Sequence, residues 1–65
     1  MRLTVNGDII ETKSSTVGEL LAELGILQGR VAVEVNLNIV KKADYDGFTL
    51  KEGDVVEIVN FVGGG

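Results

Sequence analysis

The sequence contains no histidine and no cysteine among its 65 residues. Without these side chains the chain has no general base tuned near neutral pH, no thiolate nucleophile and none of the usual soft metal ligands. We therefore expect no catalytic residue, no metal site and no bound cofactor in this chain. A chain without cysteine also gives no sign of an oxidising compartment.

Positive charge is scarce as well, since ten acidic residues stand against six basic ones and the formal net charge is −4. This balance argues against nucleic acid or an anionic membrane as a partner and favours a basic protein surface. The first residues, MRLTVNGD, turn polar too early for a signal peptide or a membrane span. We expect a cytoplasmic protein that is a monomer when free.

The chain does have enough apolar sequence for one small core. Apolar residues make up 45% of the 65 positions, which predicts a single folded domain. A chain of this size buries only about 60% of the surface that its unfolded form exposes. It therefore has no room for an enclosed active site beside its core.

Two strands are predicted first. The opening segment, MRLTV, alternates apolar and polar residues as a half-buried strand does. The pair Asn6-Gly7 supplies the positive φ angles that a tight type I′ turn requires, and residues 8–12 supply the returning strand. The chain is therefore expected to begin with a β-hairpin.

A helix is predicted next. Four apolar residues stand at helical spacing, namely Val17, Leu20, Leu21 and Leu24. Thr16 and Glu19 match a capping box, in which the Glu carboxylate reaches back to the amide of the cap residue. Gly25 can take the left-handed conformation that ends a helix. Gly18 costs the helix about 1 kcal/mol relative to alanine, and close approach to the sheet or to a partner would each explain it.

Three further strands follow. Residues 31–35, VAVEV, alternate as a strand, residues 36–38 form a turn, and residues 39–40 return as a short edge strand guarded by two lysines. Residues 52–54 form a glycine-centred turn that leads into the last strand, at residues 55–61.

The segment ADYDGF lies between the last two strands. Its carboxylates Asp44 and Asp46 suggest a calcium loop, but the repeating oxygen ligands and the closing Glu of that motif are missing. The pattern favours a polar turn that ends at Gly47, after which Phe48 and Leu50 point into the core.

The order of elements predicts an α+β domain. One main helix packed across a mixed sheet of four to five strands buries every apolar stripe in one core. With the first hairpin antiparallel and the last strand beside the first, the arrangement is a β-grasp, or ubiquitin-like, fold. We expect this domain to span residues 1–62, with residues 63–65 forming a flexible C-terminal glycine tail.

The tail, Gly63, Gly64 and Gly65, has no side chain with which to stabilise the domain. A bare glycine segment can thread into a partner's active site, and it leaves the terminal carboxylate open to attack. A carboxylate must first be activated, as by ATP to an acyl-adenylate, and the nucleophile must come from the partner because this chain has none. A frayed end and a remnant of an expression tag are the alternatives.

The last strand also predicts a docking surface. If Val56 and Ile58 face the core, alternation turns Val59 and Phe61 outward, just ahead of the tail. Exposed apolar residues there would hold the domain on a partner while the tail is inserted. The alternative is that Phe61 covers an edge of the core.

Three stretches together resemble the ThiS family, the sulfur carrier proteins of thiamine biosynthesis: TVGELLAELG, VAVEVNLNIV and LKEGDVVEIVNFVGGG. The resemblance implies that an E1-like adenylyltransferase of the ThiF type, which uses ATP and magnesium, adenylates Gly65, and that this residue is then converted to a thiocarboxylate. The sulfur would pass to a thiazole synthase of the ThiG type. The family's Gly-Gly motif maps onto Gly64 and Gly65, while Gly63 is a common preceding residue. The chain departs from many relatives in VKKADYDGF, where they carry a proline or an arginine after the Ile-Val pair.

Other functions fit parts of this pattern. The small subunit of molybdopterin synthase is similar and uses the same chemistry, although it is usually longer, with an insertion near the helix. A ubiquitin-like modifier would leave isopeptide-linked products on lysines. A pure interaction module would tolerate the loss of its last two residues.

Overall fold

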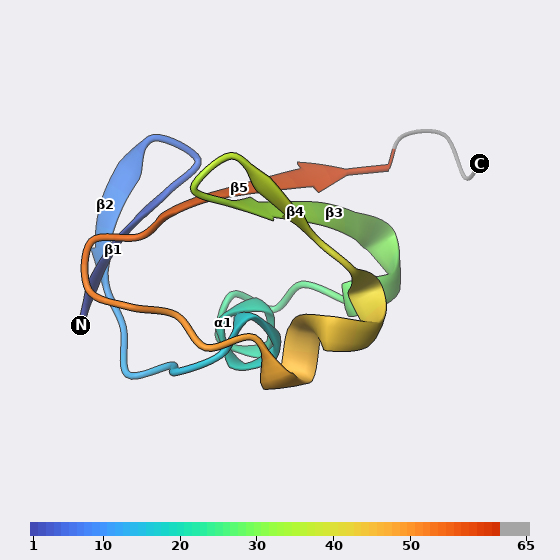
Figure 1. Ribbon diagram of the computed structural model, residues 1–65, viewed down its shortest axis with the longest axis horizontal. Coiled ribbons are helices and arrows are strands. Elements are labelled where there is room, and N and C mark those ends of the chain that lie inside the picture. The colour runs from blue at the N-terminus through green and yellow to red at the C-terminus, as the bar shows by residue number, and fades with distance from the viewer. Residues whose placement is uncertain (62–65) are drawn as a thin grey trace.

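A computed structural model describes residues 1–61 of the chain (Figure 1). These residues form one α-helix, two 3-10 helices and a sheet of five strands. In chain order the elements are β1 (Arg2–Val5), β2 (Asp8–Glu11), α1 (Val17–Glu23), η1 (Gln28–Arg30), β3 (Val31–Val35), β4 (Asn38–Val40), η2 (Lys42–Gly47) and β5 (Val55–Asn60). The predicted tail at residues 63–65 lies outside the described residues, as does Val62.

The sheet has the strand order β2-β1-β5-β3-β4, so that β5 lies between β1 and β3. β1 and β5 run parallel, whereas the other neighbouring pairs are antiparallel. The last strand therefore lies beside the first, in the middle of a mixed sheet. This topology confirms the predicted β-grasp fold.

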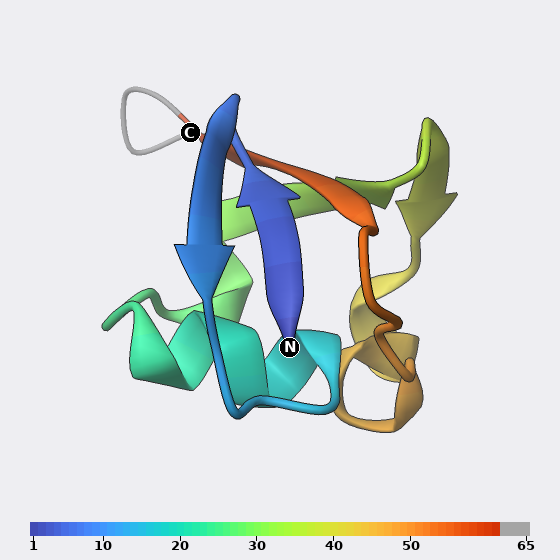
Figure 2. The same ribbon diagram turned by 90° about the vertical axis from the view of Figure 1, so that its left-hand side faces the viewer.

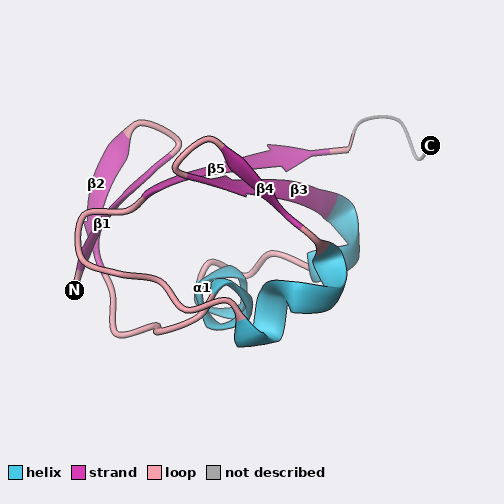
Figure 3. Ribbon diagram, viewed as in Figure 1, coloured by secondary structure: helices cyan, strands magenta, loops and turns pink. Residues whose placement is uncertain are grey.

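The helices α1 and η2 lie on the same side of the sheet (Figures 1 and 2). The core fills the space between them and the sheet, and its most deeply buried side chains include Leu3, Val17, Leu20, Leu21, Val31, Val33, Tyr45 and Val56. No described element covers the opposite face of the sheet (Figure 3), which we call the outer face. No helix within residues 1–61 is long and apolar enough to cross a membrane.

The start of α1 is capped nearly as predicted. The Thr16 hydroxyl accepts a hydrogen bond from the Glu19 amide at 3.1 Å. The Glu19 carboxylate, however, accepts from the Ser15 amide at 2.7 Å and from the Ser15 hydroxyl at 2.9 Å. The hydrogen bonds of the carboxylate therefore go to Ser15, the residue before the predicted partner Thr16, while the Thr16 amide still helps to lower the pKa of Glu19.

The end of α1 confirms the role of Gly25, whose φ is 72°. The Gly25 amide donates to Ala22 O at 3.1 Å and the Ile26 amide donates to Leu21 O at 2.8 Å, which is the pattern of a Schellman motif. Leu24 corrects the prediction, since it is 41% exposed rather than part of the core stripe. It is the C-cap residue of the helix.

The segment predicted as a polar turn is instead the 3-10 helix η2, which buries a side chain that the sequence pattern did not single out. Tyr45 is only 1% exposed, and its hydroxyl donates to Val31 O at 3.2 Å. Phe48 and Leu50 do pack into the core as predicted, the first half-buried and the second buried. The segment is therefore part of the core's second layer.

η2 also explains Gly18. A Cβ atom at this position would lie 2.2 Å from Oδ1 of Asp46 and 3.2 Å from the Asp46 Cα. The same carboxylate oxygen accepts a hydrogen bond from Gln28 Nε2 at 2.8 Å. The close neighbour of Gly18 is therefore η2, which is neither of the two that were expected, the sheet or a partner.

Both hairpin turns consist of two residues with positive φ. Asn6 (48°) and Gly7 (87°) connect β1 to β2, as predicted. Asn36 (52°) and Leu37 (72°) connect β3 to β4. The prediction of a turn at residues 36–38 is one residue too long, because Asn38 already pairs as part of β4.

Candidate functional site

The predicted site residues Gly63, Gly64 and Gly65 lie outside the described residues, and the structure describes the chain up to Phe61. The Phe61 amide donates to Arg30 O at 2.9 Å, one step beyond the last residue of β5. Pairing with β3 continues along β5 as far as Asn60. The chain is therefore held by β3 and by the end of η1 up to Phe61, four positions before Gly65.

On its other side, the end of β5 has no strand partner, because pairing with β1 stops at Val56. The side chain of Asn6 takes the place of a strand there. Its Oδ1 accepts from the Ile58 amide at 2.7 Å and its Nδ2 donates to Ile58 O at 3.2 Å. From the sequence, Asn6 was expected only to form a turn, but in the structure its side chain also supports the strand that leads to the tail.

The predicted docking residues do point outward. Val59 is 59% exposed and Phe61 is 57% exposed. The Lys42 Nζ lies 5.2 Å from the centroid of the Phe61 ring, which is a cation–π distance. The exposure favours an outward-facing ring over the alternative in which Phe61 covers a core edge. We call Val59 and Phe61 the tail-proximal patch.

The tail-proximal patch continues into the outer face. Strand register places Val59 opposite Ala32 and Glu57 opposite Glu34. Other exposed apolar side chains on this face are Ile9, Ile39 and Val55. The outer face therefore carries several apolar side chains around a central pair of carboxylates.

The central pair, Glu34 and Glu57, is electrostatically unfavourable in the free domain. Like charges directly opposite each other on neighbouring strands destabilise a sheet. Within residues 1–61 neither carboxylate forms an ion pair, whereas Glu11 pairs with the amino terminus at 3.7 Å and with Arg2 at 3.6 Å. A cationic group from another molecule would relieve this repulsion.

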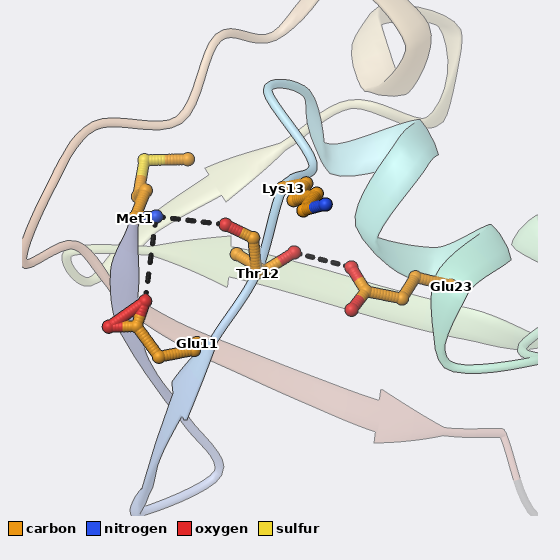
Figure 4. A pocket seen from close by; sticks show the side chains of 5 residues that line it. All are labelled: Met1, Glu11, Thr12, Lys13 and Glu23. Carbon is orange, nitrogen blue, oxygen red and sulfur yellow. Dashed lines mark hydrogen bonds and ion pairs between the residues drawn. The ribbon is translucent and has the colours of Figure 1, made fainter.

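Figure 4 shows a pocket beside the amino terminus, lined by Met1, Glu11, Thr12, Lys13 and Glu23. The terminal amine donates to Thr12 O at 2.9 Å. Glu23 accepts from the hydroxyl of Thr12 and, at 2.7 Å, from that of Ser14. These two hydroxyls, Thr12 first, lower the pKa of Glu23 against an opposing effect of burial. The bonds join α1 to the end of β2, and we assign the pocket a structural role.

The acidic residues of η2 take part in internal contacts as well. Asp46 accepts from Gln28, and the Asp44 amide donates to Lys41 O at 2.8 Å within the 3-10 helix. In the part of the chain that the structure describes, no three His, Cys, Asp or Glu side chains gather as a metal site would require. The candidate contact surfaces among the described residues are therefore their exposed apolar side chains, on the outer face, at the exit of β5 and at Leu24 and Leu27.

Comparison with known proteins gives a match to the model of the ThiS family over residues 2–65. The chain is 40% identical to the sulfur carrier protein ThiS of Bacillus subtilis, over 97% of this chain and 98% of that protein. The crystal structure of the thiamine biosynthesis protein ThiS from Geobacter metallireducens is 39% identical, with a TM-score of 0.84 and full coverage of both chains.

Two longer relatives are named thiazole synthase. The one from Paramagnetospirillum magneticum is 47% identical over 66 aligned positions, and the one from Magnetococcus marinus is 38% identical over 66. All of this chain aligns with them, but it spans only 20% of the length of each. None of the names of these relatives refers to molybdopterin.

Proposed function

Because the chain belongs to the ThiS family, the sulfur carrier proteins of thiamine biosynthesis, we propose that Gly65 carries sulfur as a C-terminal thiocarboxylate. The observation that supports this most is the reach of the family match, which runs from residue 2 to residue 65 and so includes Gly64 and Gly65. The chain acts in this proposal as a co-substrate of partner enzymes.

The chemistry takes place in two steps. A carboxylate oxygen of Gly65 attacks the α-phosphorus of ATP, pyrophosphate leaves, and an acyl-adenylate forms. A sulfide nucleophile that a partner supplies then attacks the carbonyl carbon, and AMP leaves with the electron pair of the broken C–O bond. ATP and magnesium are bound by the partner, an E1-like adenylyltransferase of the ThiF type.

In this scheme the fold positions the C-terminal residues for the partner enzyme. The end of β5 is held by β3 on one side and by the Asn6 side chain on the other. The position from which the C-terminal residues extend is therefore fixed. The tail-proximal patch, Val59 and Phe61, docks on the adenylyltransferase while Gly63 and Gly64 thread into its active site. A thiazole synthase of the ThiG type then takes the sulfur. Its involvement is supported by the two relatives of that name, each of which contains a segment that aligns with this chain.

Reconstitution of the sulfur transfer tests the proposal. The 65-residue chain is combined with the adenylyltransferase, ATP, magnesium, a sulfide source, thiazole synthase and the other substrates of the synthase, and the thiazole product is measured. We expect product only when the carrier is present, and none with a variant that lacks Gly65. Equal product from the shortened variant would contradict the proposal.

A further inference from the structure

The first hairpin turn joins Asn6 to Gly7, a pair that is chemically reactive. Asparagine deamidates when the amide nitrogen of the next residue attacks the side-chain carbonyl carbon, and glycine hinders that attack least because it has no Cβ. The chain contains four asparagines, and only Asn6 precedes a glycine. The other three, Asn36, Asn38 and Asn60, precede leucine, isoleucine and phenylalanine. The sequence therefore favours deamidation at Asn6.

The fold restrains the side chain that this reaction must move. Oδ1 of Asn6 accepts from the Ile58 amide at 2.7 Å, and Nδ2 donates to Ile58 O at 3.2 Å. Attack makes the planar side-chain amide tetrahedral and draws it toward the Gly7 nitrogen, so both bonds must open first. The Gly7 amide itself donates no hydrogen bond to another backbone group within residues 1–61. Both turn residues are exposed, so water reaches them.

The reaction requires only the chain and water. The Gly7 nitrogen bonds to Cγ of Asn6 and gives up its proton, while ammonia leaves with that proton and the electron pair of the broken C–N bond. The product is a five-membered succinimide ring. Water then adds to one of its two carbonyl carbons, and the bond from that carbon to the ring nitrogen breaks. Cleavage at Cγ yields aspartate, and cleavage at the backbone carbonyl yields isoaspartate.

Either product removes the Nδ2 donor that bonds to Ile58 O. Aspartate would place a carboxylate oxygen there, and two oxygens without a hydrogen between them repel each other. Isoaspartate adds the side-chain methylene to the main chain of a two-residue turn, and so displaces the side group that faces β5. Pairing with β1 stops at Val56. Among the described residues no strand replaces Asn6 on this side of the end of β5.

We propose that Asn6 is the deamidation site of this protein, that its hydrogen bonds to Ile58 protect it in the folded domain, and that the modification loosens the end of β5. This chemistry belongs to the chain itself and does not depend on the proposed function. The second hairpin turn offers a comparison. Asn36 has φ 52°, close to the 48° of Asn6, and its side chain also bonds to β5, through the Val55 amide at 3.0 Å. It precedes Leu37 instead of glycine.

Peptide mapping by mass spectrometry tests the site. The 65-residue chain is incubated at mildly alkaline pH, in native buffer and in guanidinium chloride above its unfolding midpoint. Deamidation raises the mass of a peptide by the difference between an amide and an acid, whereas isomerisation at Asp46-Gly47 would leave the mass unchanged. In denaturant we expect Asn6 to react before any other asparagine. An earlier reaction at another asparagine would show that the site is wrong.

The same samples test the protection. We expect deamidation of Asn6 to be roughly tenfold or more slower in native buffer, because two hydrogen bonds must open first. The factor should match the protection of the Ile58 amide against deuterium exchange, since the same opening exposes both groups. Equal rates in the two conditions, or protection of Asn6 far below that of the Ile58 amide, would show that these bonds do not protect it.

Leu37→Gly creates a matched second site. Glycine accepts the φ of 72° at this position, so the variant should fold. In denaturant its Asn36 should react about as fast as Asn6, whereas Asn36 of the wild type should stay intact over the same time. An unreactive Asn36 in the variant would contradict the role given to the following residue.

The effect on β5 is measured on the deamidated wild type, which its additional negative charge separates from the intact chain. We expect the Ile58 amide of the modified chain to exchange faster with deuterium than that of the intact chain. Unchanged exchange at Ile58 would show that deamidation does not loosen β5.

Discussion

Asn6 and Asn36 each hold the backbone of β5 from a hairpin turn. Asn6 bonds to both backbone groups of Ile58, near the end of the strand. Asn36 accepts from the Val55 amide at 3.0 Å and donates to the Asp54 carboxylate at 2.9 Å, at its start. Asparagine suits both roles, since it tolerates positive φ and carries one donor and one acceptor.

Replacement of Asn6 should loosen the strand that leads to the tail. Asn6→Gly keeps a residue that accepts positive φ but removes two hydrogen bonds, each with a net contribution of about 0.5–1.5 kcal/mol. We expect the free energy of unfolding to fall by about 1–3 kcal/mol in urea denaturation, and the Ile58 amide to exchange faster with deuterium. Asn6→Asp keeps only the acceptor and should lie in between. An unchanged exchange rate at Ile58 would show that the Asn6 side chain does not hold β5.

Gly18 lies against Asp46 of η2, where there is little room for a side chain. Gly18→Ala should gain helix propensity yet destabilise the domain by about 1–3 kcal/mol, because the new methyl group displaces the Asp46 side chain and presses on its backbone. Gly29→Ala is the matched control, since a Cβ there meets no atom within 4 Å. Equal unfolding midpoints for the two variants would contradict this account of the contact between α1 and η2.

At the scale of elements, α1 is tied to the chain around it by two of its carboxylates. The amide and hydroxyl of Ser15, with a smaller contribution from the Thr16 amide, lower the pKa of Glu19 below the usual 4.5. The hydroxyls of Thr12 and Ser14 lower that of Glu23 in the same direction. One carboxylate secures the start of the helix, and the other connects its last turn to the end of β2.

These lowered pKa values predict a dependence of stability on pH. A carboxyl group whose pKa is lower in the folded state stabilises the fold above its unfolded pKa, and that stabilisation is lost as the pH falls through the folded value. We therefore expect the urea midpoint of the wild type to fall below about pH 4.5. The double variant Glu19→Gln, Glu23→Gln should have a lower urea midpoint than the wild type at neutral pH. Its midpoint should also fall less steeply as the pH is lowered.

Asp8→Asn is the control for the change in charge, because Asp8 is an exposed residue of β2 outside these contacts. Urea midpoints between about pH 6 and about pH 3 provide the comparison. A double variant that follows the wild-type pH profile would show that neither carboxylate carries the dependence.

Elements with a strong local signal were predictable from the sequence. The hairpin at Asn6-Gly7, the cap at Thr16 and the stop at Gly25 each depend on residues a few positions apart. The burial of Tyr45 was not predictable from the sequence, because its hydroxyl bonds to Val31, 14 positions away on β3. The second role of Asn6 depends on Ile58, 52 positions away. Such contacts exist only once the chain has folded.

At the scale of the whole molecule, the two faces of the sheet have different surroundings. The helices and the core lie on one side of the sheet, while the other side and the exit of β5 carry exposed apolar residues. Alternation along β5 was enough to predict that Val59 and Phe61 point outward. The positive φ of Leu37 was not predictable, because it is a property of the folded turn.

The tail-proximal patch should matter for binding and little for folding. Phe61→Ser removes a half-exposed aromatic ring, so we expect roughly tenfold or more weaker binding to the adenylyltransferase and only a small loss of stability. Val55→Ser, on the outer face at the other end of the same strand, is the matched control and should bind as the wild type does. A large drop in melting temperature for Phe61→Ser, with unchanged binding by the folded fraction, would assign Phe61 to the core.

Intact-protein mass spectrometry tests the central claim most directly. The 65-residue chain is incubated with the adenylyltransferase, ATP, magnesium and a sulfide source, and its mass is compared with that of variants that lack Gly65 or carry one added residue after it. We expect the wild type to exchange one carboxylate oxygen for sulfur, in a fragment that contains Gly64 and Gly65. Both variants should stay unmodified and keep the wild-type circular dichroism spectrum. Sulfur in the shortened variant, or none in the wild type when the enzyme activates another carrier, would contradict the account.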